Sequence, residues 1–257
     1  ALFQQINAMF SLMKRRSFLS LIVSAPLFAN EHLQSSDIYL DAIEYASLRA
    51  LNQRLKRLRS FVGYANFNLI SYQDALFYAR NYPKIGAFTS QELSLIERLF
   101  FEDPSQYGFY GKRTCSNIEN IIADKEVLKV PHTGHYIFKG EAEQKFHRLS
   151  KDVGETLVLT SGVRNVIKQL SLYVNKIDNC NGNISKASIS LAPPGYSYHT
   201  ISDFDVGRKG WGYKNFTASF AQTQEFSRLR GLDYIRIRYT ENNTDGVRFE
   251  PWHVEIT

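Results

Sequence analysis

Two segments near the C-terminus contain the residue types that a catalytic metal site needs. The first segment contains His199 and Asp205, and the second contains Glu250 three positions before His253. Two imidazoles and a carboxylate can hold a zinc ion while one coordination position stays open for water. A further carboxylate beside the metal can act as the general base for that water. The sequence therefore predicts His199, Asp205 and His253 as metal ligands and Glu250 as the catalytic base.

The order of these residues resembles the zinc D-alanyl-D-alanine carboxypeptidase family. That family includes the vancomycin-resistance dipeptidases and certain phage endolysins, and it shares its core with the hedgehog signalling domain. The resemblance covers about residues 130–257 and rests on four motif pieces in the family's order. These pieces are Ser161-Gly-Val-Arg164 with Gln169, Ser197-x-His199, Asp205-Val-Gly207 and Glu250-Pro-Trp-His253.

The resemblance implies a role for each matching residue. It implies that His199, Asp205 and His253 bind zinc and that Glu250 is the catalytic base. Arg164 matches the arginine that contacts the substrate and steadies the developing oxyanion. A cation aimed at the tetrahedral oxygen is also what amide hydrolysis requires on chemical grounds.

Three further residues match supporting positions of the family. We expect Ser161, Gln169 and Ser197 to take part in substrate binding.

The chain departs from the family pattern between the first histidine and the aspartate. Five residues separate His199 from Asp205, whereas the family has six. Either the turn is one residue tighter, or Asp203 is the ligand. We favour Asp205 because Val206 and Gly207 follow it, as in the family.

The resemblance implies a zinc peptidase that cuts the peptide stems of the bacterial cell wall, with removal of terminal D-alanine as the leading hypothesis. The first alternative is an endopeptidase that cuts within the stem or its cross-bridge by the same zinc mechanism. A second alternative is a non-catalytic module that binds through a retained zinc fold. The shortened spacing favours this second alternative, whereas the presence of Glu250 and Arg164 argues against it.

The N-terminal segment, residues 1–29, has the pattern of a secretory signal peptide. Basic residues follow a plausible initiator Met13, a short apolar run comes next, and Ala29 ends the segment. Arg15 and Arg16 also resemble a twin-arginine export signal. We therefore expect an exported protein of the periplasm or cell envelope, with no stable membrane span after the signal is removed.

Composition is that of a globular protein. The 257 residues are 44% hydrophobic and 22% charged, and the formal net charge is +6. Three of the positive charges lie at 14–16 in the predicted signal peptide, so the remainder is about +3. The basic residues between 49 and 59 fit a solvated helix face, and we expect a peptidoglycan peptide, not a nucleic acid, as partner.

Two cysteines, Cys115 and Cys180, would suit an exported protein with one disulfide. Their separation is too large for a CxxC metal or redox pair. Sequence alone leaves open whether the two thiols meet.

Periodicity and breaker residues predict an α+β fold. A mainly antiparallel sheet with flanking helices, in residues 111–257, follows a helical N-terminal region in residues 30–110. A capping box at Thr89 opens one of the N-terminal helices. We expect helices at 36–62, 71–82, 89–101, 166–177 and 216–229. We expect extended segments at 155–160, 186–192, 204–206, 233–239 and 247–256, the last two joined by a turn at 242–246.

Overall fold

Reciprocal side-chain caps start the three N-terminal helices. The computed structural model describes residues 37–256. Asp41, Ser71 and Thr89 each accept a hydrogen bond from the backbone three residues on, where an acidic side chain bonds back. The helices that follow these caps are α1 (Ala42–Val62), α2 (Tyr72–Asn81) and α3 (Ser90–Phe101).

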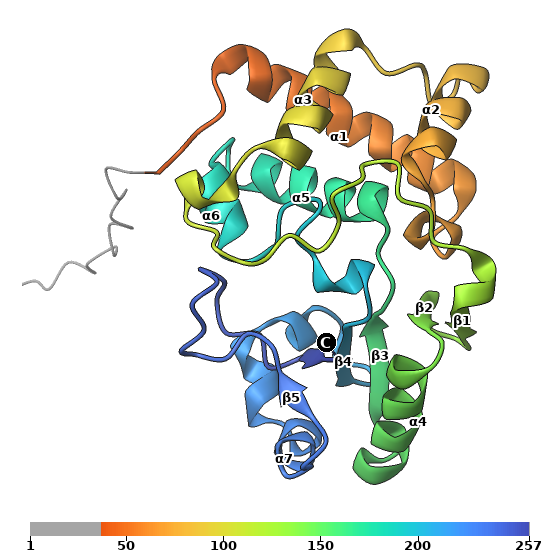
Figure 1. The fold of residues 1–257 in the computed structure, drawn as a ribbon, viewed down its shortest axis with the longest axis vertical. Coiled ribbons are helices and arrows are strands. Elements are labelled where there is room, and N and C mark those ends of the chain that lie inside the picture. Colours follow the sequence, from red (N-terminus) through yellow and green to blue (C-terminus); the bar gives the residue numbers. More distant parts are fainter. Residues whose placement is uncertain (1–36, 257) are drawn as a thin grey trace, which may run out of the picture. The chain divides into compact units, whose positions relative to one another are not determined.

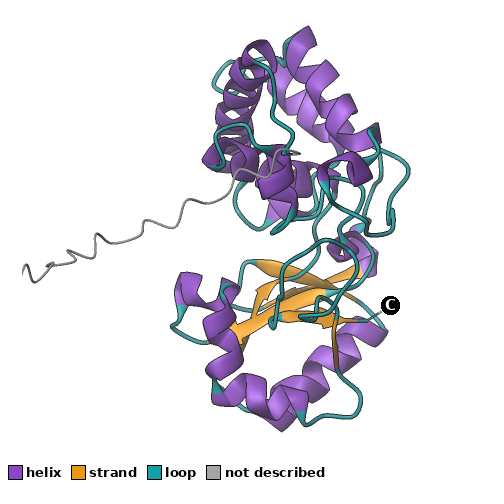
Figure 2. Cartoon of the chain, turned by 90° about the vertical axis from the view of Figure 1, so that its left-hand side faces the viewer, coloured by secondary structure: helices purple, strands orange, loops and turns teal. Residues whose placement is uncertain are grey.

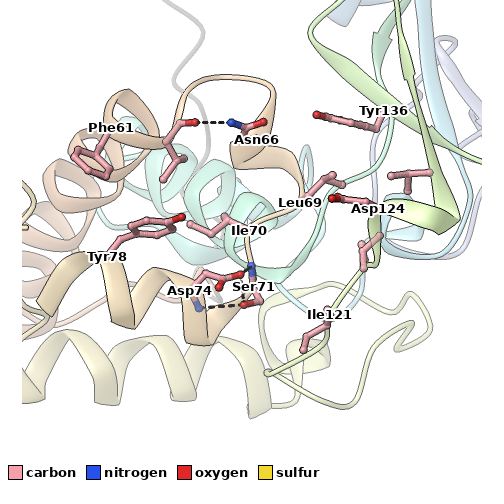
Figure 3. Close-up of a pocket in the computed structure, with 13 residues that line it drawn as sticks. Phe61, Asn66, Leu69, Ile70, Ser71, Asp74, Tyr78, Ile121, Asp124 and Tyr136 are labelled. Carbon is pink, nitrogen blue, oxygen red and sulfur yellow. Dashed lines mark hydrogen bonds between the residues drawn. The ribbon is translucent and has the colours of Figure 1, made fainter. Parts of the chain in front are cut away.

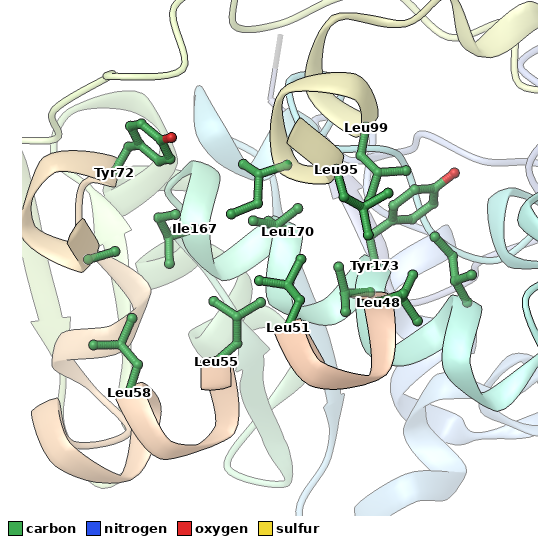
Figure 4. Close-up of a cluster of buried hydrophobic side chains, with 14 of the residues drawn as sticks. Leu48, Leu51, Leu55, Leu58, Tyr72, Leu95, Leu99, Ile167, Leu170 and Tyr173 are labelled. Carbon is green, nitrogen blue, oxygen red and sulfur yellow. The ribbon is translucent and has the colours of Figure 1, made fainter. Parts of the chain in front are cut away.

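One face of α1 is buried and mainly apolar. Leu48, Leu51, Leu55 and Leu58 recur at helical spacing and are inaccessible to solvent. They pack against α5 (Val166–Asn179) and α3 in a single hydrophobic core (Figure 4). The N-terminal helices therefore share their core with a helix that belongs to the C-terminal half of the sequence.

A four-stranded antiparallel sheet forms the second part of the fold, with strand order β3-β4-β6-β5. Its apolar face packs against α4 (Glu141–Val153) and α7 (Gln224–Arg230), and these helices cover the sheet in Figure 2. The strands are β3 (Leu157–Ser161), β4 (Phe204–Arg208), β5 (Arg236–Ile237) and β6 (His253–Glu255). The remaining elements in Figure 1 are a hairpin of β1 (Val127–Val130) with β2 (His135–Phe138) and the short helix α6 (Ile184–Ser188).

Strand register places three polar side chains side by side. Asp205 on β4 lies opposite Ser161 on β3 and opposite His253 on β6. Side chains alternate along a strand, so the neighbours Phe204 and Val206 point into the apolar core while Asp205 points to the other face. The sheet therefore presents a carboxylate and an imidazole together on its polar face.

Two buried asparagines tie the helical region to the rest of the chain. The Asn68 side chain donates to the backbone oxygens of Tyr64, Ala65 and Gly134, the last of which lies in the β1–β2 hairpin. The Asn165 backbone N–H donates to the Asn68 carbonyl, at 2.8 Å. These hydrogen bonds fix the segment after α1 against both the hairpin and the start of α5.

The predicted α+β class, the N-terminal helical region and the capping box at Thr89 are confirmed. The predicted boundary between a helical region (30–110) and a peptidase domain (111–257) stays a prediction.

Four of the predicted elements were wrong in part. Of the predicted extended segment 247–256, only β6 pairs as a strand. Residues 186–192 are not extended, because the Asn183 side chain accepts a hydrogen bond from the Lys186 N–H and starts α6. Residues 216–229 are not one helix, because Thr217 and Thr223 each cap a new helical segment and only the second becomes α7. Only two residues of 233–239 pair as a strand, since β6 begins after a turn that contains Pro251.

The structure describes both cysteines but not the predicted signal peptide. Both cysteines are free thiols, so the disulfide that Cys115 and Cys180 would allow is not formed. The predicted signal peptide, residues 1–29, lies outside the described residues. Among the helices of residues 37–256, none has the length and apolarity to cross a membrane.

Candidate metal centre

Three predicted ligands converge in the structure. One donor atom from each of His199, Asp205 and His253 lies within 4.8 Å of the other two, and all three residues are buried. Asp205 Oδ1 is 3.3 Å from His199 Nε2 and 3.4 Å from His253 Nδ1. Residues from the loop before β4, from β4 itself and from β6 thus share one centre.

The orientation of His199 is set by a backbone carbonyl. Its Nδ1 donates to the Gly162 carbonyl at 2.9 Å, so Nε2 carries the lone pair and faces Asp205. Gly162 must be glycine here, since a Cβ would lie 1.9 Å from the Tyr136 carbonyl oxygen. The close approach of β2 and the end of β3 therefore positions the carbonyl that orients the ring.

The orientation of His253 is set by a carboxylate. Its Nε2 donates to Asp203 Oδ2 at 3.1 Å, so Nδ1 is the nitrogen that faces Asp205. Asp203 also accepts hydrogen bonds from the Arg238 guanidinium and from the Ile256 N–H. Because its oxygens are taken up in this way, Asp203 lies behind His253 and does not join the cluster.

Asp205 is held on its other oxygen by an arginine. Arg164 Nη2 donates to Asp205 Oδ2 at 2.6 Å, which leaves Oδ1 toward the two rings. Ser161 accepts from Arg164 Nε at 2.8 Å, and Gln169 accepts from Nη1 at 3.5 Å. Ser161 and Gln169 therefore hold the guanidinium in place.

The electrostatics of the cluster separate the two histidines. Burial and the charge of Arg164 lower the pKa of His199 to about 4, so this ring is neutral. Burial also opposes the charged form of His253, but hydrogen bonds to Asp203 and Glu250 raise its pKa to about 9. Burial opposes the ionised form of Asp205, yet His199 and Arg164 keep its pKa well below the usual range.

Glu250 lies beside the cluster and outside the donor triplet. Its Oε2 is 3.7 Å from His253 Nδ1, and its backbone N–H donates to the Tyr239 carbonyl at 2.9 Å. Burial raises the pKa of Glu250, although the nearby His253 opposes the shift. A carboxylate with a raised pKa is a better proton acceptor near neutral pH.

The donor set passes a chemical test for a bound metal. His199 Nε2 and Asp205 Oδ1 are buried and have no hydrogen-bond partner among the described residues. Buried polar atoms are costly when unpaired, and a divalent cation at their shared centre would satisfy both. Two imidazole nitrogens and a carboxylate oxygen are ligands that zinc accepts.

A cavity of about 340 Å³ opens onto the cluster. Six predicted site residues line it: Ser161, Arg164, His199, Asp205, Glu250 and His253. Gln169 and Ser197 instead line a much smaller neighbouring cavity. The structure thus brings all the predicted site residues into one neighbourhood, but it places two of them away from the main cavity.

Several residues of the cavity wall were not predicted as site residues. They include Tyr64, His135 and Lys168. Tyr64 comes from the segment after α1, in the N-terminal region for which the sequence predicted helices but no site residues. Lys168 lies one position before Gln169 in the matched motif, but the sequence contains no signal that it would be buried.

A second and larger cavity, of about 680 Å³, lies between α1, α2 and the segment around 121–127 (Figure 3). The described residues that line it include no histidine or cysteine. Two carboxylates line it, Asp74 and Asp124, and Asp74 is used in the cap of α2, where it accepts from Ser71. We assign no chemistry to this cavity.

With the centre defined as a His/Asp/His site, its relatives can be named. Residues 138–256 match the family described as VanY: D-alanyl-D-alanine carboxypeptidase. The predicted resemblance to this family is confirmed for these residues. No curated protein matches the chain significantly.

Solved structures of peptidases are also similar to the chain. The vancomycin resistance D,D-dipeptidase VanXYg, in complex with a D-Ala-D-Ala phosphinate analog, is 20% identical with a TM-score of 0.41, over 47% of this chain and 50% of that one. The LD-carboxypeptidase LdcB is 24% identical with a TM-score of 0.41, over 50% of this chain and 62% of that one. VanYB in complex with D-alanine-D-alanine is 18% identical with a TM-score of 0.40, over 58% of this chain and 84% of that one. The chain thus covers half of the first of these structures and less than two thirds of the second.

Proposed function

We propose that this protein is a zinc-dependent peptidase that hydrolyses the stem peptides of peptidoglycan, acting as a D-alanyl-D-alanine carboxypeptidase. The observation that carries the proposal is the convergence of two oriented imidazoles and a carboxylate beside Glu250, in a cavity wide enough for a peptide end. The family match over residues 138–256 supports the substrate class.

The residues that would hold the metal are His199, Asp205 and His253. Zinc, when bound, polarises the scissile carbonyl and lowers the pKa of water to about 7. The protein's own contribution is to orient the donors: Gly162 fixes one ring and Asp203 fixes the other.

Glu250 is the proposed proton carrier. Its carboxylate takes a proton from the attacking water and then delivers one to the leaving amine. The raised pKa of Glu250 favours both steps at neutral pH, because the group accepts a proton readily and can still release it.

Arg164 has two proposed tasks. It positions Asp205 through the 2.6 Å hydrogen bond, and it brings positive charge to the cavity wall, where an oxyanion would form. Ser161 and Gln169 serve the reaction by holding this guanidinium. The Ser197 carbonyl accepts hydrogen bonds from the Thr200 N–H and the Thr114 hydroxyl, and so supports the turn that carries His199. Action in the periplasm or cell envelope, after export by the predicted signal, belongs to the same proposal.

The test compares Glu250→Gln with the wild-type protein on a peptide that ends in two D-alanines. We expect hydrolysis to fall about 10²- to 10⁴-fold, while zinc content measured by atomic emission stays at the wild-type level. Glu97→Gln, on the exposed side of α3, is the matched control and should leave the rate unchanged. Wild-type turnover in Glu250→Gln would contradict the assignment.

The bond that is cut is read from the products. Mass analysis of digested wall peptides should show loss of a single terminal alanine. Fragments from internal cleavage would instead support the endopeptidase alternative. Zinc-loaded protein that binds the peptide but releases no product would support the non-catalytic alternative.

A further inference from the structure

A lysine is buried in the wall of the cavity that contains the candidate metal centre. Lys168 lies in the first turn of α5, only 5% exposed, and lines this cavity with Tyr64 and His135. Burial of an ammonium group is costly unless an anion accompanies it. The position of Lys168 therefore calls for a partner.

No such partner is present within residues 37–256. The Lys168 ammonium makes no hydrogen bond or ion pair with the described residues, and its contacts are with the rings of Tyr64 at 5.0 Å and Phe67 at 5.8 Å. Ring faces attract a cation but do not replace a carboxylate. Burial, with the charges of Arg164 and Arg59, lowers the pKa of Lys168 to about 8, so the group is still charged at neutral pH.

The other cations of the cavity are already matched by acids. Arg164 pairs with Asp205 at 2.6 Å, and Arg248 lies 3.9 Å from Glu250. Among the described cations that line this cavity, Lys168 is thus the one without an acidic partner. The charge balance of the cavity favours a ligand with one carboxylate near Lys168.

Two neighbours complete the wall around the ammonium. Tyr64 Oη is 3.3 Å from His135 Nε2, and His135 Nδ1 is buried with no hydrogen-bond partner among the described residues. Burial and the charge of Lys168 lower the pKa of His135 to about 4, so the ring is neutral and has one N–H to donate. When Tyr64 donates to Nε2, that N–H is on Nδ1.

The wall is held in place before any ligand arrives. Asn68 ties the Tyr64 segment to Gly134, directly before His135, and Asn165 ties it to the start of α5. A binding site whose groups are already positioned loses less entropy when it captures a ligand.

We propose that Lys168, with Tyr64 and His135, forms a carboxylate-binding subsite that reads a carboxylate of the substrate peptide. The proposal rests on the peptidase function proposed above and adds a recognition element that the N-terminal helical region helps to build. The carboxylate is either the C-terminus of the peptide or a side-chain carboxylate farther along it.

The experiment measures KM and kcat for three forms of one peptide that ends in two D-alanines and carries one side-chain carboxylate. One form is unmodified, one has its C-terminus amidated, and one has its side-chain carboxylate amidated. Zinc-loaded wild-type protein is compared with Lys168→Met and Lys168→Arg. Lys176→Met, two turns farther along α5, is the matched control.

We expect Lys168→Met to raise KM for the unmodified peptide roughly 10- to 100-fold, the loss typical of a charged hydrogen bond, with a much smaller change in kcat. Lys168→Arg should recover most of this loss, and Lys176→Met should cause none. For one of the two amidated peptides, Lys168→Met should not change KM any further. The carboxylate that is blocked in that peptide is the one that Lys168 binds.

Other outcomes would overturn the subsite. An unchanged KM in Lys168→Met rules the subsite out. A wild-type KM that is insensitive to both amidations also rules it out, and this result does not depend on any variant folding correctly. Wild-type protein that hydrolyses none of the peptides would instead contradict the proposed function, so the two failures are distinguishable.

Discussion

The two walls of the cavity differ in the hydrogen-bond and ion-pair partners of their polar side chains. In the first wall, the metal wall formed by His199, Asp205 and His253, each proposed ligand has a neighbour that fixes its orientation. Gly162 orients His199, Asp203 orients His253 and Arg164 orients Asp205. In the second wall, the lysine wall formed by Lys168, Tyr64 and His135, the contacts of the Lys168 ammonium within residues 37–256 are with the ring faces of Tyr64 and Phe67. We infer from this difference that the first wall holds a bound cation and that the second receives the carboxylate of a substrate.

The largest expected effect separates the two aspartates of the metal wall. Asp205→Ala removes a proposed ligand and should abolish stoichiometric zinc binding. Asp203→Asn removes only the group that orients His253 and should weaken zinc binding about 10- to 100-fold. Competition with a chromophoric chelator measures both affinities. The reverse order of the two effects would make Asp203 the ligand.

The next effect tests whether the metal wall depends on a close backbone approach. Gly162→Ala places a Cβ 1.9 Å from the Tyr136 oxygen, so the carbonyl that orients His199 must move. We expect the free energy of unfolding to fall by about 1–3 kcal/mol, as for other overpacked sites. Zinc affinity should fall with it.

Gly231→Ala is the control for this substitution, because its nearest contact would be at 3.4 Å and its φ is −78°. Denaturant titration with and without zinc gives both quantities. Unchanged zinc affinity in Gly162→Ala would show that the ring is positioned by other contacts.

The sequence predicted the metal wall and not the lysine wall, for a physical reason. His199, Asp205, Glu250 and His253 belong to motifs in which spacing and residue type together specify chemistry. Lys168 lies in α5 and Tyr64 in the turn after α1, and neither is a residue of a matched motif. Their meeting depends on the packing of α1 on α5, which short-range patterns do not encode.

The same reasoning explains the elements that were wrong. Capping by Asn183 and Thr223 overrode periodicity, because one side-chain hydrogen bond decides where a helix starts. The tightened spacing before Asp205 left two ligand candidates, and only the hydrogen bonds of Asp203 to Arg238 and His253 distinguish them. No pattern in the sequence predicts those contacts.

A smaller effect tests the link between the helical region and the lysine wall. Asn68→Ala removes three hydrogen bonds to backbone oxygens and should lower the free energy of unfolding by about 1–2 kcal/mol. The wall loosens, so KM for the carboxylate peptide should rise, while zinc affinity stays the same. Loss of zinc binding in this variant would show that the two walls are not independent.

The smallest effect is a pH dependence of the lysine wall. The pKa of Lys168, about 8, is below its value of about 10.4 in an unfolded chain. Between pH 8 and about pH 10.4, Lys168 is protonated in more of the unfolded chains than of the folded ones. Its contribution to the free energy of unfolding therefore rises with pH over this range. The groups around it that set this behaviour are Arg164, Arg59, His135 and Tyr64.

Two measurements check this prediction. At pH 7, the free energy of unfolding measured by denaturant titration should be larger for Lys168→Met than for wild type. This difference should narrow as the pH rises above 8. Discrimination between the carboxylate and amidated peptides should fade over the same rise, since the ammonium loses its charge. A gap that widens with pH would contradict the sign of the shift.

The most direct test of the central claim is the position of zinc in a crystal of the protein, found by anomalous scattering at the zinc edge. The account predicts one ion per chain, bound by His199 Nε2, Asp205 Oδ1 and His253 Nδ1, with Glu250 beside it and not bound to it. Zinc bound at another place, or bound by Asp203 in place of Asp205, would contradict it.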